Sequence, residues 1–401
     1  MPPRLRDYDS LSPRVRLFLW LVDRVGAVLL WPARVWPARR GAAARPIEKI
    51  LLLRCDGIGD LVLTTPALRA VRRRFPAAQI DLVVGPWAAS LAPLLGDVDR
   101  VLTYASWGYR RLRGRRDGLG ADWRFAREMR RERYDLAIDL RGDLLSLFPL
   151  LFWRVPRRCG RADRGGEFTL TDVAAPASPD RVSEIDRTLD VAAFLGADPA
   201  DRRLALAIPA EATARAAHEF AARGIAPARL ILFCPEVQWP WRRWPKGNFV
   251  ALGRRLIAEG FLVGVDGSPA NAAPGALARE IGEGAHDLTG AFDLAALAAA
   301  FTMVRGFVGV DSGPHHLAAA VGARGVVLFG PTDVARFGSD GRHVRTLAAP
   351  CPMRPCHQRG DCARPQDWCM AKIAPAQVAD ELLALLSEDP PPSSPAANEP
   401  V

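Results

Sequence analysis

The chain alternates short apolar runs with amphipathic stretches over most of its length. KILLLR (49–54) is such a run, and a glycine-containing turn and a stretch with apolar residues at helical spacing follow it. A continuous apolar run of this length is typical of a strand that is buried on both faces. Further runs occur at 80–84, 101–104, 135–140, 230–235, 261–266, 306–311 and 325–330. Strands that alternate with helices predict an α/β fold with parallel sheets and crossover helices.

This alternation runs twice along the chain, and a less regular segment rich in Arg, Asp and Pro separates the two series. It predicts two α/β domains, at residues 47–205 and 206–387. The C-terminal residues 388–401 are rich in Pro, Ser and Ala and are expected to form a disordered tail. Residues 1–46 match neither pattern and form a separate basic and apolar segment.

The positive charge of the chain is concentrated in two segments. The 401 residues include 54 Lys and Arg against 44 Asp and Glu, a net charge of +10. Residues 1–46 carry nine Arg and three Asp, and residues 105–134 carry ten Arg and four acidic residues, so each segment contributes +6. Localised positive charge favours an anionic surface or substrate. Neither segment follows a helix-turn-helix, zinc-finger or RNA-recognition pattern, which argues against a nucleic-acid partner.

The N-terminal segment contains a mostly apolar stretch, Leu17 to Trp31, with Asp23 and Arg24 at its centre. Central charges are unfavourable in a transmembrane helix, and no small-residue cleavage site of a signal peptide follows. Arginines and tryptophans around a short apolar helix suit a membrane interface. The alternative is a helix that packs on the protein's own surface. We therefore expect a cytoplasmic protein whose N-terminal segment can contact a membrane surface.

The turn DGIGD (56–60) follows the first predicted strand and opens a helix. Ligands of parallel α/β folds bind at the carboxyl ends of strands, and glycines such as Gly57 and Gly59 let a ligand approach the backbone. Asp60 places a carboxylate at this edge, although the role of a helix N-cap would also explain it. Val62 stands where a dinucleotide fingerprint requires its third glycine, which argues against a nicotinamide-dependent oxidoreductase.

A second strand-to-helix turn lies in GVDSGPHHLAAA (309–320). The strand is expected to end at Asp311 and the helix to start near Pro314, because proline suits the first helical turn. Free backbone amides and imidazoles at such a turn can bind a phosphate. The residues in question are Ser312, Gly313 and either His315 or His316. The alternative is a capped turn with surface histidines.

A third loop, PEVQWPWRRWPKGNF (235–249), also leaves the carboxyl end of a predicted strand. It carries three cations beside three tryptophans: Arg242, Arg243 and Lys246 beside Trp239, Trp241 and Trp244. A diphosphate requires such charges when no metal neutralises it. The alternative is a solvated loop rich in Arg and Trp.

Four of the seven cysteines cluster near the C-terminus, at Cys351, Cys356, Cys362 and Cys369. Their spacing lacks the C-x2-C pairs of the common zinc ribbons. A structural metal, a disulfide and packed thiols are all compatible with it. We expect reduced thiols, because the chain is long and shows no secretory signal.

Three motifs together resemble those of a known enzyme family. RCDGIGDLVLTTPALRAVRRRFP (54–76), QWPWRRWP (238–245) and VGVDSGPHHLAAAVGARGVVLFGPTD (308–333) are similar to motifs of the bacterial ADP-heptose:lipopolysaccharide heptosyltransferases, glycosyltransferase family nine. The resemblance runs from about Ile47 to Leu386, in the family's order and rough spacing. It implies a GT-B fold, in which two Rossmann-like domains face a cleft, with the acceptor bound by the N-terminal domain and the sugar nucleotide by the C-terminal one.

The resemblance also implies roles for individual residues. Asp60 takes the position of the general base, and Arg242 that of a phosphate-binding lysine. The nucleotide-binding set then comprises Arg242, Lys246, Asp311, Ser312, Gly313 and His316, with Gly57 and Gly59 on the acceptor side. The implied reaction is an inverting transfer of heptose from ADP-heptose to the lipopolysaccharide inner core, an anionic lipid-linked acceptor, without a metal or other cofactor.

The sequence departs from the family pattern on the nucleotide side. Many members have a Glu for the ribose after a G-x-P turn, whereas no acid occurs here between Asp266 and Glu280. Glu236 stands where a Gly is common, and Gln238 where Arg, Ser or Thr is common. A transferase of the same fold that uses another nucleotide sugar is therefore the alternative.

Overall fold

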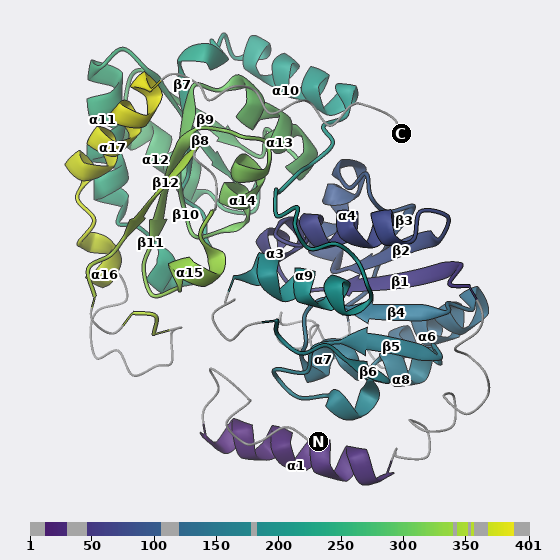
Figure 1. Ribbon diagram of the computed structural model, residues 1–401. Helices are drawn as coiled ribbons and strands as arrows, with labels where there is room; N and C mark the ends of the chain where they lie inside the picture. The colour runs from purple at the N-terminus through teal and green to yellow at the C-terminus, as the bar shows by residue number, and fades with distance from the viewer. Residues whose placement is uncertain are drawn as a thin grey trace. The chain divides into compact units, whose positions relative to one another are not determined.

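The computed structural model describes residues 13–29, 46–105, 120–177, 183–339, 343–351, 354–356 and 368–388. The chain divides into two compact units, Met1–Pro209 and Ala210–Val401, and each contains its own parallel sheet (Figure 1). Several predicted features lie outside the described residues: the remainder of the N-terminal segment, residues 106–119 of the second basic segment, Cys362 and tail residues 389–401.

The first unit is built on a parallel sheet with the strand order β3-β2-β1-β4-β5-β6. Its strands are β1 (Lys49–Arg54), β2 (Gln79–Val84), β3 (Arg100–Thr103), β4 (Leu136–Asp139), β5 (Arg157–Gly160) and β6 (Asp172–Val173). Its helices are α1 (Pro13–Leu29), α3 (Ile58–Val62), α4 (Thr65–Arg74), η3 (Pro86–Leu94), α6 (Gly120–Glu132), α7 (Leu144–Leu147), α8 (Leu150–Trp153), η4 (Glu167–Thr169) and α9 (Glu184–Phe194). The four apolar side chains of β1 are at most 1% exposed, as expected for a central strand covered on both faces.

The second unit repeats this plan with the order β12-β11-β10-β7-β8-β9. Its strands are β7 (Leu230–Cys234), β8 (Leu262–Gly267), β9 (Ala285–Thr289), β10 (Gly306–Val310), β11 (Gly325–Phe329) and β12 (Val344–Ala348). Its helices are α10 (Ala210–Ala222), η5 (Pro227–Arg229), η6 (Pro240–Arg242), α11 (Lys246–Ala258), α12 (Ala273–Ile281), α13 (Leu294–Met303), α14 (Gly313–Ala320), α15 (Val334–Phe337), α16 (Trp368–Ala371) and α17 (Pro375–Ser387).

The single helix expected after β1 is two helices in the structure. α3 ends at Val62, and α4 begins at Thr65 with Pro66 in its first turn. Proline has no N–H with which to continue the hydrogen bonds of the preceding helix, so a new helix starts there.

Both sheets reverse their strand order at the same point. In each unit the first strand in chain order lies between the second and the fourth. The chain therefore continues to one side of the sheet after the first strand and to the other side after the fourth. The switch point lies between β1 and β4 in the first unit and between β7 and β10 in the second. Ligands of open α/β sheets bind outside the carboxyl ends of the strands at such a switch point. A ligand-binding site is therefore expected in the loops that follow these four strands.

Candidate active site

The switch point of the first unit brings together the loops that follow β1 and β4. Leu53 pairs with Asp139 across these two parallel strands, so residues 55–60 and 140–143 leave adjacent strand ends. The predicted acceptor-side residues Gly57, Gly59 and Asp60 all lie in the first of these loops or at the start of α3.

Asp60 is held at the N-terminus of α3. Its Oδ2 accepts a 3.1 Å hydrogen bond from the amide of Gly57, the N-cap residue, and its side chain is 28% exposed. A Cβ at Gly57 would lie 2.7 Å from the same oxygen, so glycine is needed to leave the carboxylate in place. Gly59 is buried within α3. The structure thus holds a partly exposed carboxylate at a helix N-terminus, in an arrangement that suits proton transfer with a ligand.

Arg54, the last residue of β1, orients the other oxygen of Asp60. Its guanidinium nitrogens lie 2.9 Å from Asp56 Oδ1, 3.3 Å from Asp60 Oδ1 and 3.1 Å from Glu184 Oε2. The Arg54 side chain is 1% exposed, so these charge-assisted contacts are shielded from water. Asp60 is therefore fixed through both carboxylate oxygens, by Gly57 and by Arg54.

Asp56 is a second carboxyl group in the same turn. Burial raises its pKa to about 7, against the opposing effect of Arg54. Its side chain is 16% exposed, compared with 28% for Asp60. Of the two carboxylates, Asp60 is therefore the one more accessible to a ligand.

Three charged residues of this network carry little or no signal in the sequence. Arg54 left one signal, because it ends a strand that is otherwise apolar after its first residue. Arg141 follows β4 and forms an ion pair with Asp143, the N-cap of α7. Glu184 lies 130 residues from Arg54 in the chain, so no local spacing could have linked the two.

The switch point of the second unit joins Arg242 to Asp311. Asp311 follows β10, and its Oδ2 lies 3.1 Å from Arg242 Nη1 and accepts a 2.5 Å hydrogen bond from Thr332 Oγ1. Its side chain is 4% exposed, whereas that of Arg242 is 23% exposed. Asp311 thus fixes a partly exposed guanidinium at the carboxyl end of the sheet. Thr332 follows the neighbouring strand β11, and no motif of the sequence gives it a role in this site.

α14 begins at Gly313 with Ser312 as its N-cap. The Ser312 amide donates a 3.2 Å hydrogen bond to Nδ1 of His315, and so it is already paired within the chain. Of the two amides expected to bind a phosphate, that of Gly313 is therefore the better candidate. Its position in the first turn of the helix favours an anion.

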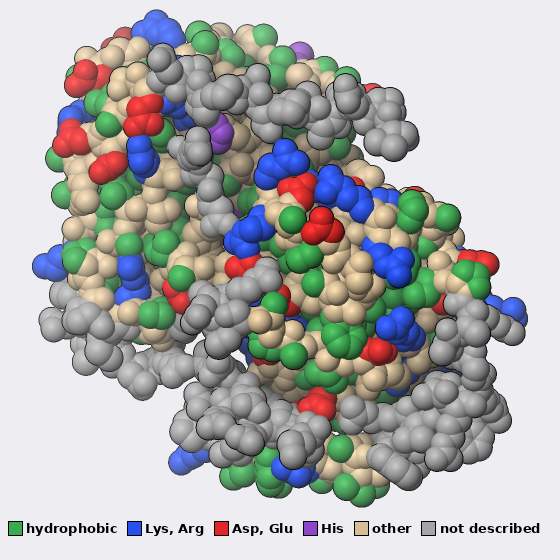
Figure 2. Space-filling view, viewed as in Figure 1, with side chains coloured by type: hydrophobic (Ala, Val, Ile, Leu, Met, Phe, Trp, Pro, Cys, Tyr) green, Lys and Arg blue, Asp and Glu red, His purple; other side chains and the backbone are tan. Residues whose placement is uncertain are grey.

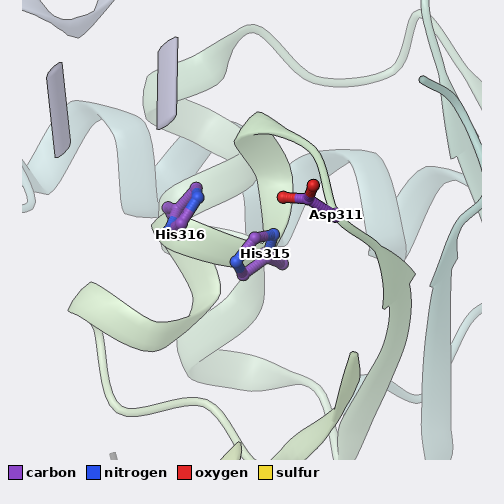
Figure 3. Close-up of side chains that lie close together, drawn as sticks. All are labelled: Asp311, His315 and His316. Atoms are coloured by element: carbon purple, nitrogen blue, oxygen red, sulfur yellow. The ribbon is translucent and has the colours of Figure 1, made fainter. Parts of the chain in front are cut away.

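The rings of His315 and His316 lie in contact beside Asp311 (Figure 3), with centroids 3.6 Å apart and planes tilted by 39°. They are 0% and 4% exposed, which contradicts the alternative of surface histidines. Burial lowers the pKa of both, that of His316 well below its usual range, where His315 and Arg242 contribute as well. Both rings are therefore neutral at pH 7 and provide hydrogen bonds without charge. Within the described residues, His316 Nδ1 has no hydrogen-bond partner.

One group of three side chains in the described part of the chain could hold a metal ion. It consists of Asp311, His315 and His316, whose possible ligand atoms lie within 4.8 Å of one another. Their surroundings do not suit a cation. Asp311 Oδ2 is already engaged by Arg242 and Thr332, and the guanidinium places a positive charge beside the carboxylate. This strand end favours an anion.

Lys246 is not joined to the Arg242–Asp311 pair. It begins α11, forms an ion pair with Glu280 of α12, and has a side chain that is 56% exposed. The structure therefore separates two cations that the sequence placed together.

The turn after β8 has no acidic residue of its own, but Glu236 from another loop places a carboxylate there. Its Oε2 accepts a 2.6 Å hydrogen bond from the Ser268 amide, and its Oε1 accepts one of 3.0 Å from Asn271 Nδ2. Burial, with a contribution from Glu236, raises the pKa of Asp266 to about 7. The acid at this turn thus comes from the loop after β7.

The clustered cysteines that the structure describes are Cys351, Cys356 and Cys369, and all three are free thiols. Cys356 Sγ donates a 3.9 Å hydrogen bond to the Pro331 carbonyl. Pro331 precedes Thr332, so this thiol contacts the chain next to a residue that holds Asp311.

Comparison with known proteins identifies the family. Residues 122–366, more than half of the chain, match the model of glycosyltransferase family 9 (heptosyltransferase). The chain belongs to glycosyltransferase family 9. It is 28% identical over 362 residues to lipopolysaccharide heptosyltransferase 1 of Pseudomonas aeruginosa, an alignment that covers 84% of this chain and 98% of the relative. It is 25% identical over 357 residues to lipopolysaccharide heptosyltransferase 2 of Salmonella typhimurium, and this alignment covers 85% of this chain and 99% of that relative.

The fold of this family 9 member matches that of a solved relative. The structure of the Escherichia coli ADP-heptose lipopolysaccharide heptosyltransferase II aligns with a TM-score of 0.67 at 22% identity, over 84% of this chain and 98% of the other. The predictions of the family, of a GT-B α/β fold and of glycosyltransferase activity are thereby confirmed. In the described residues, no helix is long and apolar enough to cross a bilayer.

Proposed function

We propose that this family 9 transferase moves heptose from ADP-heptose to the lipopolysaccharide inner core, with inversion at the anomeric carbon and without a metal ion. The Asp60 carboxylate carries this proposal, because Gly57 and Arg54 hold both of its oxygens while leaving it partly exposed. The relatives named for heptose transfer support the substrate class, and the name of the solved relative supports the donor.

In the proposed step, Asp60 takes the proton from a hydroxyl of the acceptor sugar. The hydroxyl oxygen then forms a bond to the anomeric carbon, while the bond from that carbon to the diphosphate oxygen breaks and its electron pair leaves with ADP. Attack and departure on opposite faces of the carbon invert its configuration. Since Asp60 is oriented before the acceptor binds, little reorganisation of the carboxylate is needed.

The second unit would stabilise the charge on the departing ADP. Arg242, fixed by Asp311, is a partly exposed cation, and the Gly313 amide lies at the N-terminus of α14. His316 adds a neutral imidazole. Fixed cations and dipoles perform the task that a metal ion performs in other transferases, which supports metal independence. Ser312 and Lys246 stay predicted contacts of the nucleotide.

We assign the acceptor to the first unit. The described part of its basic segment includes α6, a helix of net charge +1 in which Arg124, Arg127, Arg130 and Arg131 stand against Asp122, Glu128 and Glu132. These positive charges complement an acceptor that carries carboxylates and phosphates, rather than a nucleic acid. A lipid-linked acceptor also implies that the enzyme works at the cytoplasmic face of the inner membrane.

A second candidate is a transferase of the same fold with another nucleotide sugar. Glu236 favours it, because this carboxylate enters the 267–272 turn from a different strand than the ribose acid of many family members. Contacts to the ribose and the base would differ accordingly.

Nucleotide binding and transfer by the full chain test the proposal. A ligand that binds the native state raises the melting temperature, so ADP, UDP, GDP and NAD are compared, each with magnesium and with EDTA. Transfer from ADP-heptose to a heptose-free core is then followed by NMR of the new linkage. Stabilisation by UDP or GDP alone would favour the second candidate. Transfer that needs magnesium would contradict metal independence, and retained configuration would contradict the single displacement.

A further inference from the structure

The helix α1 is apolar on two opposite faces. One face packs on the first unit: Leu19 is buried, and Gly26 lies so close to Phe168 of η4 that a Cβ there would be 2.5 Å from the ring. The opposite face exposes six apolar side chains, each between 47% and 76% exposed: Leu17, Phe18, Leu21, Val25, Val28 and Leu29. These six residues are called the outer face of α1 below.

Asp23 points away from the outer face. Its side chain is 3% exposed, and its Oδ1 accepts a 2.7 Å hydrogen bond from the Gly166 amide. The acid that argued against a membrane helix in the sequence therefore anchors α1 on the protein. The charged side chains that the structure describes as exposed on α1 are Arg14 and Arg24, and Arg24 lies over the Trp20 ring, 4.9 Å from its centroid.

Two further exposed apolar side chains lie at α7 and α8. Phe148 and Phe152, 45% and 40% exposed, form a ring pair with centroids 5.3 Å apart around α7 and α8. α7 contacts η4, the short helix on which α1 packs. Figure 2 shows hydrophobic side chains mixed with Lys and Arg along the lower edge of the molecule, where Figure 1 places α1.

We propose that the outer face of α1 docks the enzyme on the surface of an anionic lipid bilayer, with the helix lying in the plane of the interface. A surface helix with a second, exposed apolar face lacks a partner for that face, and six neighbouring exposed apolar residues exceed the scattered apolar residues of ordinary surfaces. Arginines beside an apolar face match an interfacial helix on anionic headgroups. The inference rests on the proposed function, whose acceptor is lipid-linked.

A second copy of this chain fits the outer face less well. A two-fold interface built from this face would bury the exposed Arg14 and Arg24 of both copies among apolar side chains, without an acidic partner on the outer face. Spanning the bilayer does not fit either, because no helix among the described residues is long and apolar enough.

Vesicle sedimentation with the full chain tests the docking surface. The probes are vesicles of phosphatidylcholine alone and vesicles that also contain phosphatidylglycerol. Wild type is expected to bind the anionic vesicles, less strongly at high salt. The double variant Leu21→Asp/Val25→Asp is expected to lower the partition coefficient about tenfold or more, since two apolar side chains lose their burial. The matched control is Phe194→Asp on α9, whose native side chain is 47% exposed and lies outside the outer face.

Two further measurements separate docking from folding and from chemistry. The double variant is expected to keep the wild-type melting temperature and its transfer rate to a water-soluble acceptor without acyl chains. Absence of wild-type binding to anionic vesicles, or equal binding by the double variant and Phe194→Asp, would overturn the inference. A wild-type dimer that the double variant abolishes would do the same. Vesicle binding without any heptose transfer would support docking and contradict the proposed function.

Discussion

The amide of Gly57 donates a 3.1 Å hydrogen bond to Asp60 Oδ2, and a Cβ at Gly57 would lie only 2.7 Å from that oxygen. The φ angle of Gly57 is −88°, which any residue can adopt. The need for glycine therefore comes from the carboxylate and not from the backbone.

Gly57→Ala should displace the Asp60 carboxylate and lower kcat by about tenfold to a hundredfold, because a small misplacement of a catalytic group is costly. The melting temperature should change little. Steady-state kinetics of the variant are compared with Gly247→Ala, where a Cβ meets nothing within 4 Å. Equal kcat values for the two variants would show that the position of Asp60 does not matter.

Asp60→Asn should lower kcat by about a hundredfold or more, because the amide cannot take a proton from the acceptor. The KM for the donor should change little, since the amide can still accept from Gly57. The control is Asp172→Asn, a carboxylate of the same unit with a similar exposure of 24%. Near-normal turnover of Asp60→Asn would remove Asp60 from the mechanism.

Arg242→Ala should lower kcat/KM for the donor by about a hundredfold, because it removes a fixed cation from the leaving diphosphate. Lys246→Ala should cost roughly twofold, since this lysine is exposed and paired with Glu280. Measuring kcat/KM for the donor in both variants tests whether Arg242 acts on the diphosphate while Lys246, which the structure places apart from it, does not. A loss with Lys246→Ala as large as that with Arg242→Ala would contradict this assignment.

Glu236→Gln should weaken ADP binding by about tenfold. The NH2 group of the glutamine cannot accept a hydrogen bond, so one of the two bonds by which Glu236 holds the turn after β8 is lost. Isothermal titration with ADP measures the change. Glu283→Gln, at an exposed position of the same unit, is the control. Unchanged ADP affinity in Glu236→Gln would place the 267–272 turn outside the nucleotide site.

Asp266 predicts a pH dependence of stability. Its pKa of about 7 lies above that of the unfolded chain, near 4, so between these values the folded chain holds a proton that the unfolded chain has released. Stability should therefore fall as the pH rises through this window. Asp266→Asn mimics the protonated form and should raise the melting temperature at pH 8 by a few degrees, with little effect at pH 4. The size follows from a shift of about 2–4 °C for each kcal/mol gained in the free energy of unfolding. A difference between variant and wild type that is independent of pH would contradict the raised pKa.

Local patterns in the sequence were sufficient for the fold and for most of the loops that form the site. A strand covered on both faces must be continuously apolar, and KILLLR shows this in its own residues. Turns at strand ends need glycine, proline and small polar residues, so DGIGD and VDSGPHH could be recognised without knowledge of any neighbour. The resemblance to glycosyltransferase family 9 rests on the same local motifs.

The tertiary structure decided which of these residues act together. Glu184 reaches Arg54 across 130 residues, and Arg242 meets Asp311 because β7 and β10 are neighbours in the sheet. Asp23 is an anchor because it points toward Gly166, while the same helix turns its outer face to solvent. Periodicity shows where a strand or helix begins and ends, but contacts between distant residues depend on strand order and on the direction in which each helix packs.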